Sequence, residues 1–509
     1  MMRHSTDFEF DDLQALFRFG HGKLTDTCFM LLDIADADAA KAWLGKAPIS
    51  SATALDPPPE TALQIAFSSA GLRVLGLRES ILEGFSDEFI TGMAGDEGRS
   101  RRLGDVGANA PEHWDWGGDP GRIPHVLLLL YAVKGGVEAW RNTIEAPPFS
   151  SAFWLLKVLP TRDIGAIEPF GFADGISQPK LDWRVRQGPD IHERDRYSNR
   201  LAPGEFVLGY PNEYGQYTPR PLIDPRQDPP ALGLPDAADA SSLKDFGRNG
   251  SYLVIRQLHQ DVPGFWQFVD KAAGAVPEAR EQLAAGMVGR QRDGSPLVPP
   301  ADEKIPGIPV EDRNNHFTYE GDPAGHRCPV GAHIRRANPR TGDFPAGVTG
   351  IFSRLIQMFG FGQRRQDEDL IASARFHRLL RRGRTYGPVL PPEDAVKPDA
   401  PADERGLQFI VLVANISRQF EFVQNAWLMS STFGGVQGEQ DPLLGNREPL
   451  RNGDATEHFN RPDPAGPLRK SCRLPQFVTV RGGGYFFMPG LRALRYIAAS
   501  TMAERDGTV

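Results

Sequence analysis

Tyr252-Leu253-Val254-Ile255-Arg256-Gln257-Leu258 is a short and largely apolar run, which predicts a buried strand. Apolar residues then recur at helical spacing, so a helix is predicted to begin near Val262. The same order occurs earlier in the chain, where the apolar run 28–34 is followed by a helical pattern over residues 37–44. A strand followed closely by a helix is therefore a recurring unit of this sequence.

Similar patterns extend over both halves of the chain. Further strands are predicted at 63–67, 125–133, 153–159, 407–413, 477–480 and 484–487. Further helices are predicted at 417–430, at 491–502 and, within an irregular segment, at 352–358. Strands followed by long helices on few connections are typical of antiparallel sheets with helices packed on one face. We therefore predict an α+β fold in which this design occurs twice.

One segment separates the two halves. Residues 224–240 are rich in Pro, Ala and Asp, a composition typical of a long loop. We place the main boundary there, which gives an N-terminal domain of residues 1–225 and a C-terminal domain of residues 226–509.

Composition limits the possible partners and locations. The 509 residues carry a net charge of −8, which provides no general field for binding nucleic acid, so small-molecule partners are expected. The three cysteines are too few and too scattered for a disulfide framework and favour a reducing compartment. The longest apolar run, 126–133, is far shorter than the roughly 20 residues that cross a bilayer, so no membrane segment is expected. Residues 1–12 show no secretion signal, and a cytoplasmic location is predicted. The sequence does not determine the oligomeric state, and a homo-oligomer is one of the possibilities.

The stretch 168–179, Glu-Pro-Phe-Gly-Phe-Ala-Asp-Gly-Ile-Ser-Gln-Pro, sets one aspartate between glycines in an apolar run. Loss of hydration disfavours the charged form of a carboxylate there, and perturbed acids concentrate at functional sites. Gly171 and Gly175 permit backbone conformations closed to other residues and allow a large group to approach closely. The alternative is a tight turn in which Asp174 bonds its own backbone.

The segment 326–340 combines a histidine with several arginines. His333 stands between Gly-Ala and an apolar residue, and imidazole is a usual axial ligand of haem iron. Arg335, Arg336 and Arg340 follow closely and can neutralise the two haem propionates.

Other interpretations of this segment stay open. A lone buried histidine is often a satisfied core residue. His326, Cys328 and His333 could hold zinc, although no second pair follows at the usual spacing. Cys328 could instead be a thiolate ligand of haem, and the basic run could be a solvated face.

The segment 377–388 contains two adjacent arginines in a strand-like context. Successive side chains of a strand point to opposite faces, so Arg381 and Arg382 are predicted to face opposite sides. A guanidinium stays charged at any working pH and stabilises negative charge on a departing oxygen. A solvated arginine cluster is the alternative.

In their order along the chain and in the segments that accompany them, these motifs resemble those of the dye-decolorizing peroxidase family. The resemblance rests on 171–175, 331–340 and 380–387 and extends nearly from end to end, with a length similar to that of the larger subclass. It implies two ferredoxin-like domains of the dimeric α+β barrel superfamily, with antiparallel sheets and peripheral helices. It also implies haem b, mostly in the second domain, hydrogen peroxide as oxidant, and a bulky aromatic or dye-like electron donor.

The resemblance also assigns roles to individual residues. It makes His333 the iron ligand, and it makes Asp174 and Arg381 the distal acid and arginine. Arg382 is the alternative to Arg381, because a one-residue slip in register exchanges the faces of a strand. Glu421 is the candidate carboxylate behind the iron ligand. The other residues expected at the haem are Gly171, Phe172, Gly175, Arg335 and, as a propionate partner, Arg340.

Peroxide chemistry fits these residue types. A carboxylate can move a proton from one peroxide oxygen to the other while an arginine stabilises the separating charge, and an aspartate base predicts activity on the acidic side of neutrality. Some relatives have an asparagine where this chain has Gly383. Tyr386, Tyr210 and Trp427 are conceivable electron relays, although aromatic residues are more often core. Two rivals are a haem-handling protein for haem storage or iron release, without peroxidase turnover, and a haem-free structural protein.

Overall fold

The structure is a computed structural model that describes residues 8–183, 200–299, 314–340, 373–450, 453 and 455–500. The helix predicted at 352–358 and the last two residues of the helix predicted at 491–502 lie outside these ranges. No helix in the described ranges combines the length and apolar character that a membrane crossing needs.

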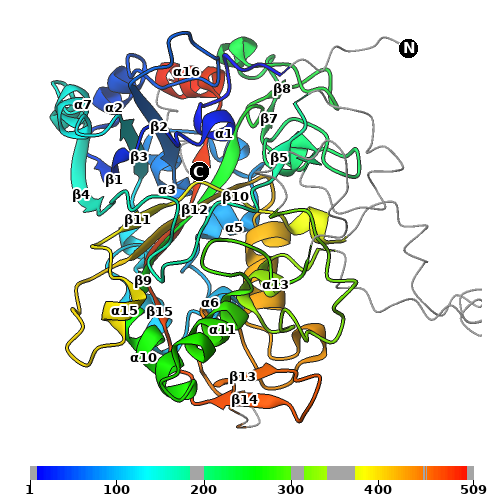
Figure 1. Ribbon diagram of the computed structural model, residues 1–509. Helices are drawn as coiled ribbons and strands as arrows, with labels where there is room; N and C mark the ends of the chain where they lie inside the picture. The colour runs from blue at the N-terminus through cyan, green and yellow to red at the C-terminus, as the bar shows by residue number, and fades with distance from the viewer. Residues whose placement is uncertain are drawn as a thin grey trace, which may run out of the picture.

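The N-terminal half forms a four-stranded antiparallel sheet in the order β4-β1-β3-β2 (Figure 1). This order, with a helix between β1 and β2 and another between β3 and β4, is that of a ferredoxin-like unit. Asp36 caps the first of these helices, because its side chain accepts the Ala39 N–H over 2.8 Å. The elements are β1 (Asp26–Ile34), α2 (Ala37–Leu44), β2 (Thr61–Phe67), β3 (Val126–Ala132), α7 (Val137–Ile144) and β4 (Phe153–Leu159).

The C-terminal half repeats the arrangement, with the strand order β10-β12-β9-β15 and with β11 also paired to β12. The two strands predicted at 477–480 and 484–487 are one continuous strand, β15. The glycines between them continue the strand, and Gly482 leaves room for Trp116, whose ring nitrogen would lie 2.3 Å from an added Cβ. The elements are β9 (Ser251–Gln260), α10 (Val262–Ala272), α11 (Pro277–Val288), β10 (Leu380–Arg381), β11 (Arg384–Tyr386), β12 (Gly406–Val413), β15 (Val478–Met488) and α16 (Leu491–Ala499).

The two sheets join into one. β15 pairs with β9 along its length and with β2 at Phe487 and Phe67, which makes a single nine-stranded sheet. The predicted α+β fold with two ferredoxin-like units is confirmed. The domain boundary near residue 225 stays a prediction.

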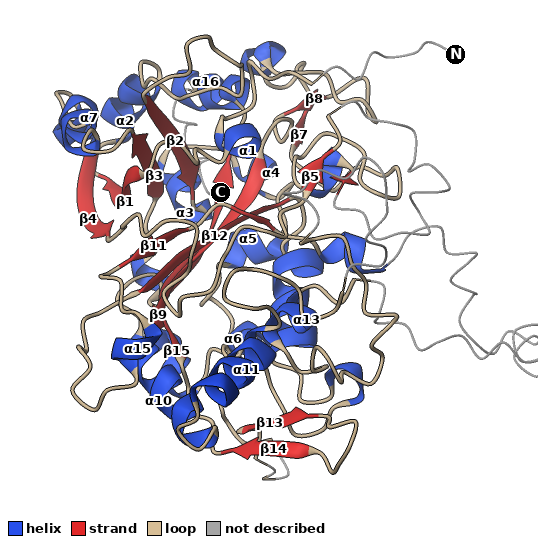
Figure 2. Ribbon diagram, in the orientation of Figure 1, coloured by secondary structure: helices blue, strands red, loops and turns tan. Residues whose placement is uncertain are grey.

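Both faces of the central strands are buried. Met30 and Leu32 pack into the cluster that includes α2 and α16, whereas Phe29 and Leu31 pack into a second cluster on the other face. Irregular segments such as 206–210 supply much of that second cover, and Figure 2 shows helices beside loop segments around the sheet. The prediction of helices on one face therefore describes only part of the packing.

The segment after β12 is wound more widely than the α-helix predicted for residues 417–430. It forms π-helical turns over Ser417–Glu421 and Val423–Leu428. Such turns are rare in proteins as a whole, but where they occur they are often at functional sites. Here they bring Phe420, Val423 and Leu428 to the wall of a cavity.

Candidate active site

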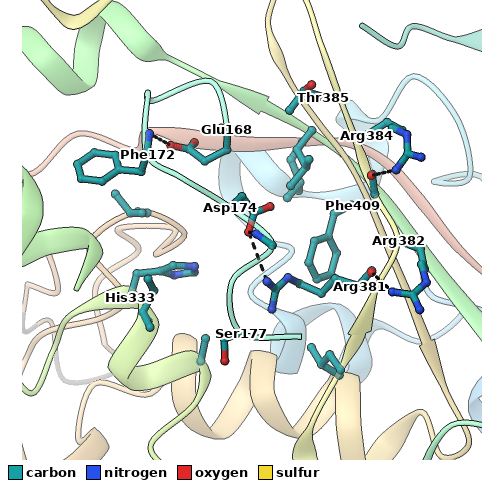
Figure 3. A pocket seen from close by; sticks show the side chains of 18 of the residues that line it. Glu168, Phe172, Asp174, Ser177, His333, Arg381, Arg382, Arg384, Thr385 and Phe409 are labelled. Atoms are coloured by element: carbon teal, nitrogen blue, oxygen red, sulfur yellow. Dashed lines mark hydrogen bonds and ion pairs between the residues drawn. The ribbon is translucent and has the colours of Figure 1, made fainter. Parts of the chain in front are cut away.

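One cavity of about 840 Å³ brings the three sequence motifs together. Asp174, His333 and Arg381 all line it, from the loop after β4, the start of α13 (His333–Ala337) and β10, respectively. Figure 3 shows the His333 ring on one side of this space and the Asp174 and Arg381 side chains on the other. Asp174 and Arg381, which lie 207 positions apart in the sequence, therefore converge only through the fold.

Asp174 lies on a tight hairpin. Its N–H donates to the Ala166 carbonyl over 3.0 Å, and its carboxylate accepts the Gly175 N–H over 2.6 Å. Gly171 and Gly175 have φ values of 92° and 81°, a conformation that favours glycine. The turn interpretation and the functional one thus hold together. The Asp174 side chain is 48% exposed, because it faces the cavity and not the apolar core that its sequence neighbours suggested.

Arg381 pairs with Asp174. Its Nη2 lies 3.3 Å from Asp174 Oδ1, and its main-chain N–H donates to the Gln178 side chain over 3.2 Å. Arg382 turns the other way, since its guanidinium donates to the carbonyls of Leu16 and Phe17 over 2.7 and 2.8 Å. Strand alternation therefore assigns Arg381 to the acid and Arg382 to the attachment of the N-terminal segment.

The packing of β12 explains why position 383 is a glycine. A Cβ at this position would lie 2.4 Å from the Gln408 carbonyl of β12. The close approach of two backbones leaves no room for a side chain, so an asparagine does not fit here.

His333 is held by a buried carboxylate. Its Nδ1 lies 3.0 Å from Asp441 Oδ2. Burial alone would lower the pKa of His333, but the Asp441 carboxylate outweighs it and the net direction is upward. Because Nδ1 is used by Asp441, Nε2 is the ring nitrogen available to a metal.

Asp441 is itself fixed in place. Its Oδ1 accepts the N–H groups of Leu443 and Leu444 over 2.9 and 2.8 Å, and its side chain is fully buried. The prediction of Glu421 in this role is wrong. Glu421 accepts the Tyr485 hydroxyl over 2.9 Å and pairs with Arg99, also at 2.9 Å.

A haem group fits the residues of this cavity. Its volume lies within the 300 to 1,000 Å³ of typical cofactor pockets. One histidine presents a ring nitrogen while a carboxylate holds the other, as is usual for histidines that bind metals. The surrounding wall is largely apolar and includes Val288, Leu428, Leu443 and Val478.

The rival metal ligands do not assemble. In the described ranges, no three His, Cys, Asp or Glu side chains form a metal-binding group. Burial raises the pKa of the Cys328 thiol to about 12, which disfavours the thiolate that a metal requires. Cys328 is also absent from the residues that line the described cavity.

Two predicted haem residues, Arg335 and Arg340, are held by other contacts. Arg335 donates to the Cys328 and Asp322 carbonyls over 2.7 and 3.0 Å. Arg340 is fully buried, where it donates to the Asn315 and Phe317 carbonyls and stacks 3.9 Å from the Phe317 ring. Neither is among the residues found to line the cavity, and their contact with haem stays a prediction.

Two polar residues of the predicted motifs that were given no role of their own line the same space. Arg378 and Asn338 both reach Ser177, over 3.4 and 3.3 Å. Of the other predicted haem residues, Phe172 and Gly175 line the cavity, whereas Gly171, in the same hairpin, is not among the lining residues. Arg378 stands three residues before Arg381, within a segment whose arginines the sequence did indicate.

Glu168 is a second acid of the cavity. Burial raises its pKa to about 7, and the nearby Asp174 charge adds to the effect, whereas hydrogen bonds to the carboxylate oppose it. It opens the motif that contains Asp174, so its position in an apolar run was a signal that could have identified it.

The aromatic candidates for electron relay are buried. Tyr386 donates its hydroxyl to the Leu258 carbonyl over 3.0 Å, and Tyr210 donates to Asn249 over 2.6 Å. Trp427 packs edge-on against His377 and Phe422. These are core contacts, and a relay role stays a prediction.

Known proteins resemble this chain over most of its length, although no protein-family profile matches it. A multifunctional dye peroxidase from Amycolatopsis sp. is 32% identical over 391 residues, which are 73% of this chain and 71% of the relative. A dye-decolorizing peroxidase from Mycena epipterygia is 28% identical across 97% of this chain and 87% of the relative. The solved dye-decolorizing peroxidase from Auricularia auricula-judae superposes with a TM-score of 0.71 and 25% identity, over 97% of this chain and 100% of that one. With the Asp174, Arg381 and His333 site in one cavity, these similarities show that the chain belongs to the dye-decolorizing peroxidase family.

Proposed function

We propose that this chain reduces hydrogen peroxide at a haem b held by His333, with Asp174 and Arg381 as its catalytic residues. Family membership makes the chain a haem peroxidase. The observation that carries the residue assignment is the shared cavity, in which the ring held by Asp441 faces the Asp174–Arg381 pair.

Bound haem supplies the iron that binds peroxide and exchanges electrons with it. The protein supplies the proton transfer. Asp174 takes the proton from one peroxide oxygen and returns it to the other, which leaves as water. Arg381, 3.3 Å from the Asp174 carboxylate, stabilises the negative charge on the departing oxygen and keeps Asp174 directed into the cavity.

The electron donor is an aromatic compound. The relative from Amycolatopsis sp. is named a multifunctional dye peroxidase, which supports dye-like donors for this chain. The reaction takes place in the cytoplasm, a location supported by the free cysteines Cys28, Cys328 and Cys472. Activity assays with phenolic and dye donors, and fractionation of the producing cells, test these two assignments.

Absorbance spectroscopy of the purified protein tests the function. The expected result is a Soret band, a haem b signature after extraction into pyridine, and a rapid spectral change on addition of peroxide. His333→Ala is expected to lose haem or to change the iron spectrum, and Asp174→Ala to keep haem but slow the change about 10² to 10⁴-fold. The exposed Asp399→Ala is the matched control and should behave as wild type.

Three results would contradict the proposal. Unchanged haem content and an unchanged iron spectrum in His333→Ala would contradict the assignment of His333 as the iron ligand. A normal rate of the peroxide reaction in Asp174→Ala would contradict the assignment of Asp174 as the acid that moves the proton. Haem binding without any response to peroxide would instead favour a haem-handling protein.

A further inference from the structure

The loop that carries Asp174 is a hairpin closed by its own main chain. The Glu168 N–H donates to the Phe172 carbonyl over 2.9 Å, and the Asp174 N–H donates to the Ala166 carbonyl over 3.0 Å. Gly171 turns the chain between these arms. Hydrogen bonds within the hairpin set its shape, and contacts outside it are needed to set its position on the sheet.

The Glu168 side chain makes such a contact. Its Oε1 accepts the Phe172 N–H over 3.0 Å, and its Oε2 accepts the Phe170 N–H over 2.9 Å. Oε2 also accepts the side-chain amide of Gln260, the last residue of β9, over 2.9 Å. One carboxylate thus receives two donors from the hairpin and one from the sheet. Figure 3 shows Glu168 beside Phe172, on the side of the cavity that carries Asp174.

We propose that Glu168 is a positioning residue, which ties the hairpin to Gln260 and thereby sets how far Asp174 reaches into the cavity. The inference rests on the proposed function, because it concerns the placement of the acid that moves the peroxide proton.

The residue type fits this role. A carboxylate accepts hydrogen bonds through both oxygens, whereas a glutamine would present an NH₂ group to one of the N–H donors. Glu168 is therefore not equivalent to its neutral isostere at this position. An acid whose pKa is shifted upward by burial, within a cavity, is also typical of a functional site.

Other contacts keep the hairpin folded without Glu168. The Trp266 indole N–H donates to the Phe170 carbonyl over 3.0 Å, and the Ala173 N–H donates to the Arg292 carbonyl over 2.9 Å. Phe170 and Phe172 are both buried in the cluster beneath α10. A variant that lacks the Glu168 carboxylate is thus expected to keep its fold and its haem and to lose only the fine placement of Asp174.

The test uses the full-length holoenzyme with Glu168→Ala, Glu168→Gln and Gln260→Leu, and with the exposed Glu60→Ala as matched control. The second-order rate constant for peroxide is expected to fall about 10 to 100-fold in Glu168→Ala and less in Glu168→Gln. Haem content and the resting absorbance spectrum are expected to stay unchanged, because His333 lies across the cavity. Hydrogen exchange should rise at the amides of residues 170–172.

A double variant sharpens the test. If Glu168 acts through Gln260, Gln260→Leu should lower the rate constant alone but add nothing to Glu168→Ala. Additive losses would overturn the coupling, and a wild-type rate constant or lost haem in Glu168→Ala would overturn the positioning role. If wild type itself does not react with peroxide, the proposed function fails, and hydrogen exchange alone then decides whether Glu168 holds the hairpin.

Discussion

Replacement of Asp441 by asparagine tests the link between this buried carboxylate and the iron ligand. The side-chain carbonyl of asparagine can still accept the N–H groups of Leu443 and Leu444, which occupy Oδ1. The atom that faces His333 Nδ1 becomes an NH₂ donor and cannot accept a hydrogen bond. The variant therefore keeps the shape of the site and removes one charge-assisted hydrogen bond of 3.0 Å.

The expected magnitude follows from that contact. A hydrogen bond to a charged group contributes about 1.5 to 3 kcal/mol. Loss of the partner behind a metal-bound histidine typically lowers metal affinity about 10 to 100-fold, or about 1.4 to 2.8 kcal/mol. The two estimates agree, so Asp441→Asn is expected to release haem about 10 to 100 times more readily than wild type.

Haem transfer to excess apomyoglobin measures this release. Glu421→Gln is the matched control, because it also changes a buried carboxylate to an amide but one that contacts Arg99 and Tyr485. It is expected to lower the free energy of unfolding while haem release stays as in wild type. Wild-type haem release in Asp441→Asn, or an equal increase in Glu421→Gln, would refute the assignment of Asp441.

Four further results are expected. Arg381→Leu should slow the reaction with peroxide about 10²-fold at wild-type stability. Arg382→Leu should instead lower the free energy of unfolding by about 2 to 3 kcal/mol, because two main-chain carbonyls lose their donor; stopped-flow absorbance and chemical denaturation separate the two effects. Gly383→Ala should lower the Tm, since its Cβ would lie 2.4 Å from a carbonyl oxygen; an unchanged melt would contradict this packing. The pKa of Glu168 rises from 4.5 to about 7 on folding, so the folded state holds more protons between these values and stability falls as the pH rises. Glu168 accounts for at most about 3 kcal/mol of this pH-dependent change in the free energy of unfolding. The change should be absent in Glu168→Gln, so that chemical denaturation gives a flatter dependence of stability on pH between 4.5 and 7.

Local patterns predicted most of the fold because apolar runs and helical periodicity are local properties. The helix at Ala37–Leu44 and the strand at Phe153–Leu159 lie where their patterns predict them. The π-helical turns after β12 could not be predicted, because they differ from an α-helix in having i→i+5 instead of i→i+4 main-chain hydrogen bonds, which the sequence does not show. Similarly, cover of the second sheet face by irregular segments leaves no periodic signal.

The site was only partly readable for a similar reason. Asp174, His333 and Arg381 stand in unusual local contexts, and the cavity brings these three together. Asp441 lies 108 residues from His333, so only the tertiary structure shows that Asp441, and not Glu421, is the carboxylate that contacts His333. Asp441 does precede an apolar Pro-Leu-Leu run, a context as unusual for an acid as that of Asp174.

Because β15 (Val478–Met488) pairs with β2, the two halves of the sheet can join only after β15 has been synthesised. Asp174 follows the last strand of the first sheet, whereas His333 and Arg381 belong to the second half of the chain. Of the strands in the described ranges, β15, which joins the sheets at Phe487 and Phe67, is the last to be synthesised. The Asp174 hairpin is therefore synthesised long before β15 can join its sheet to the one that carries Arg381.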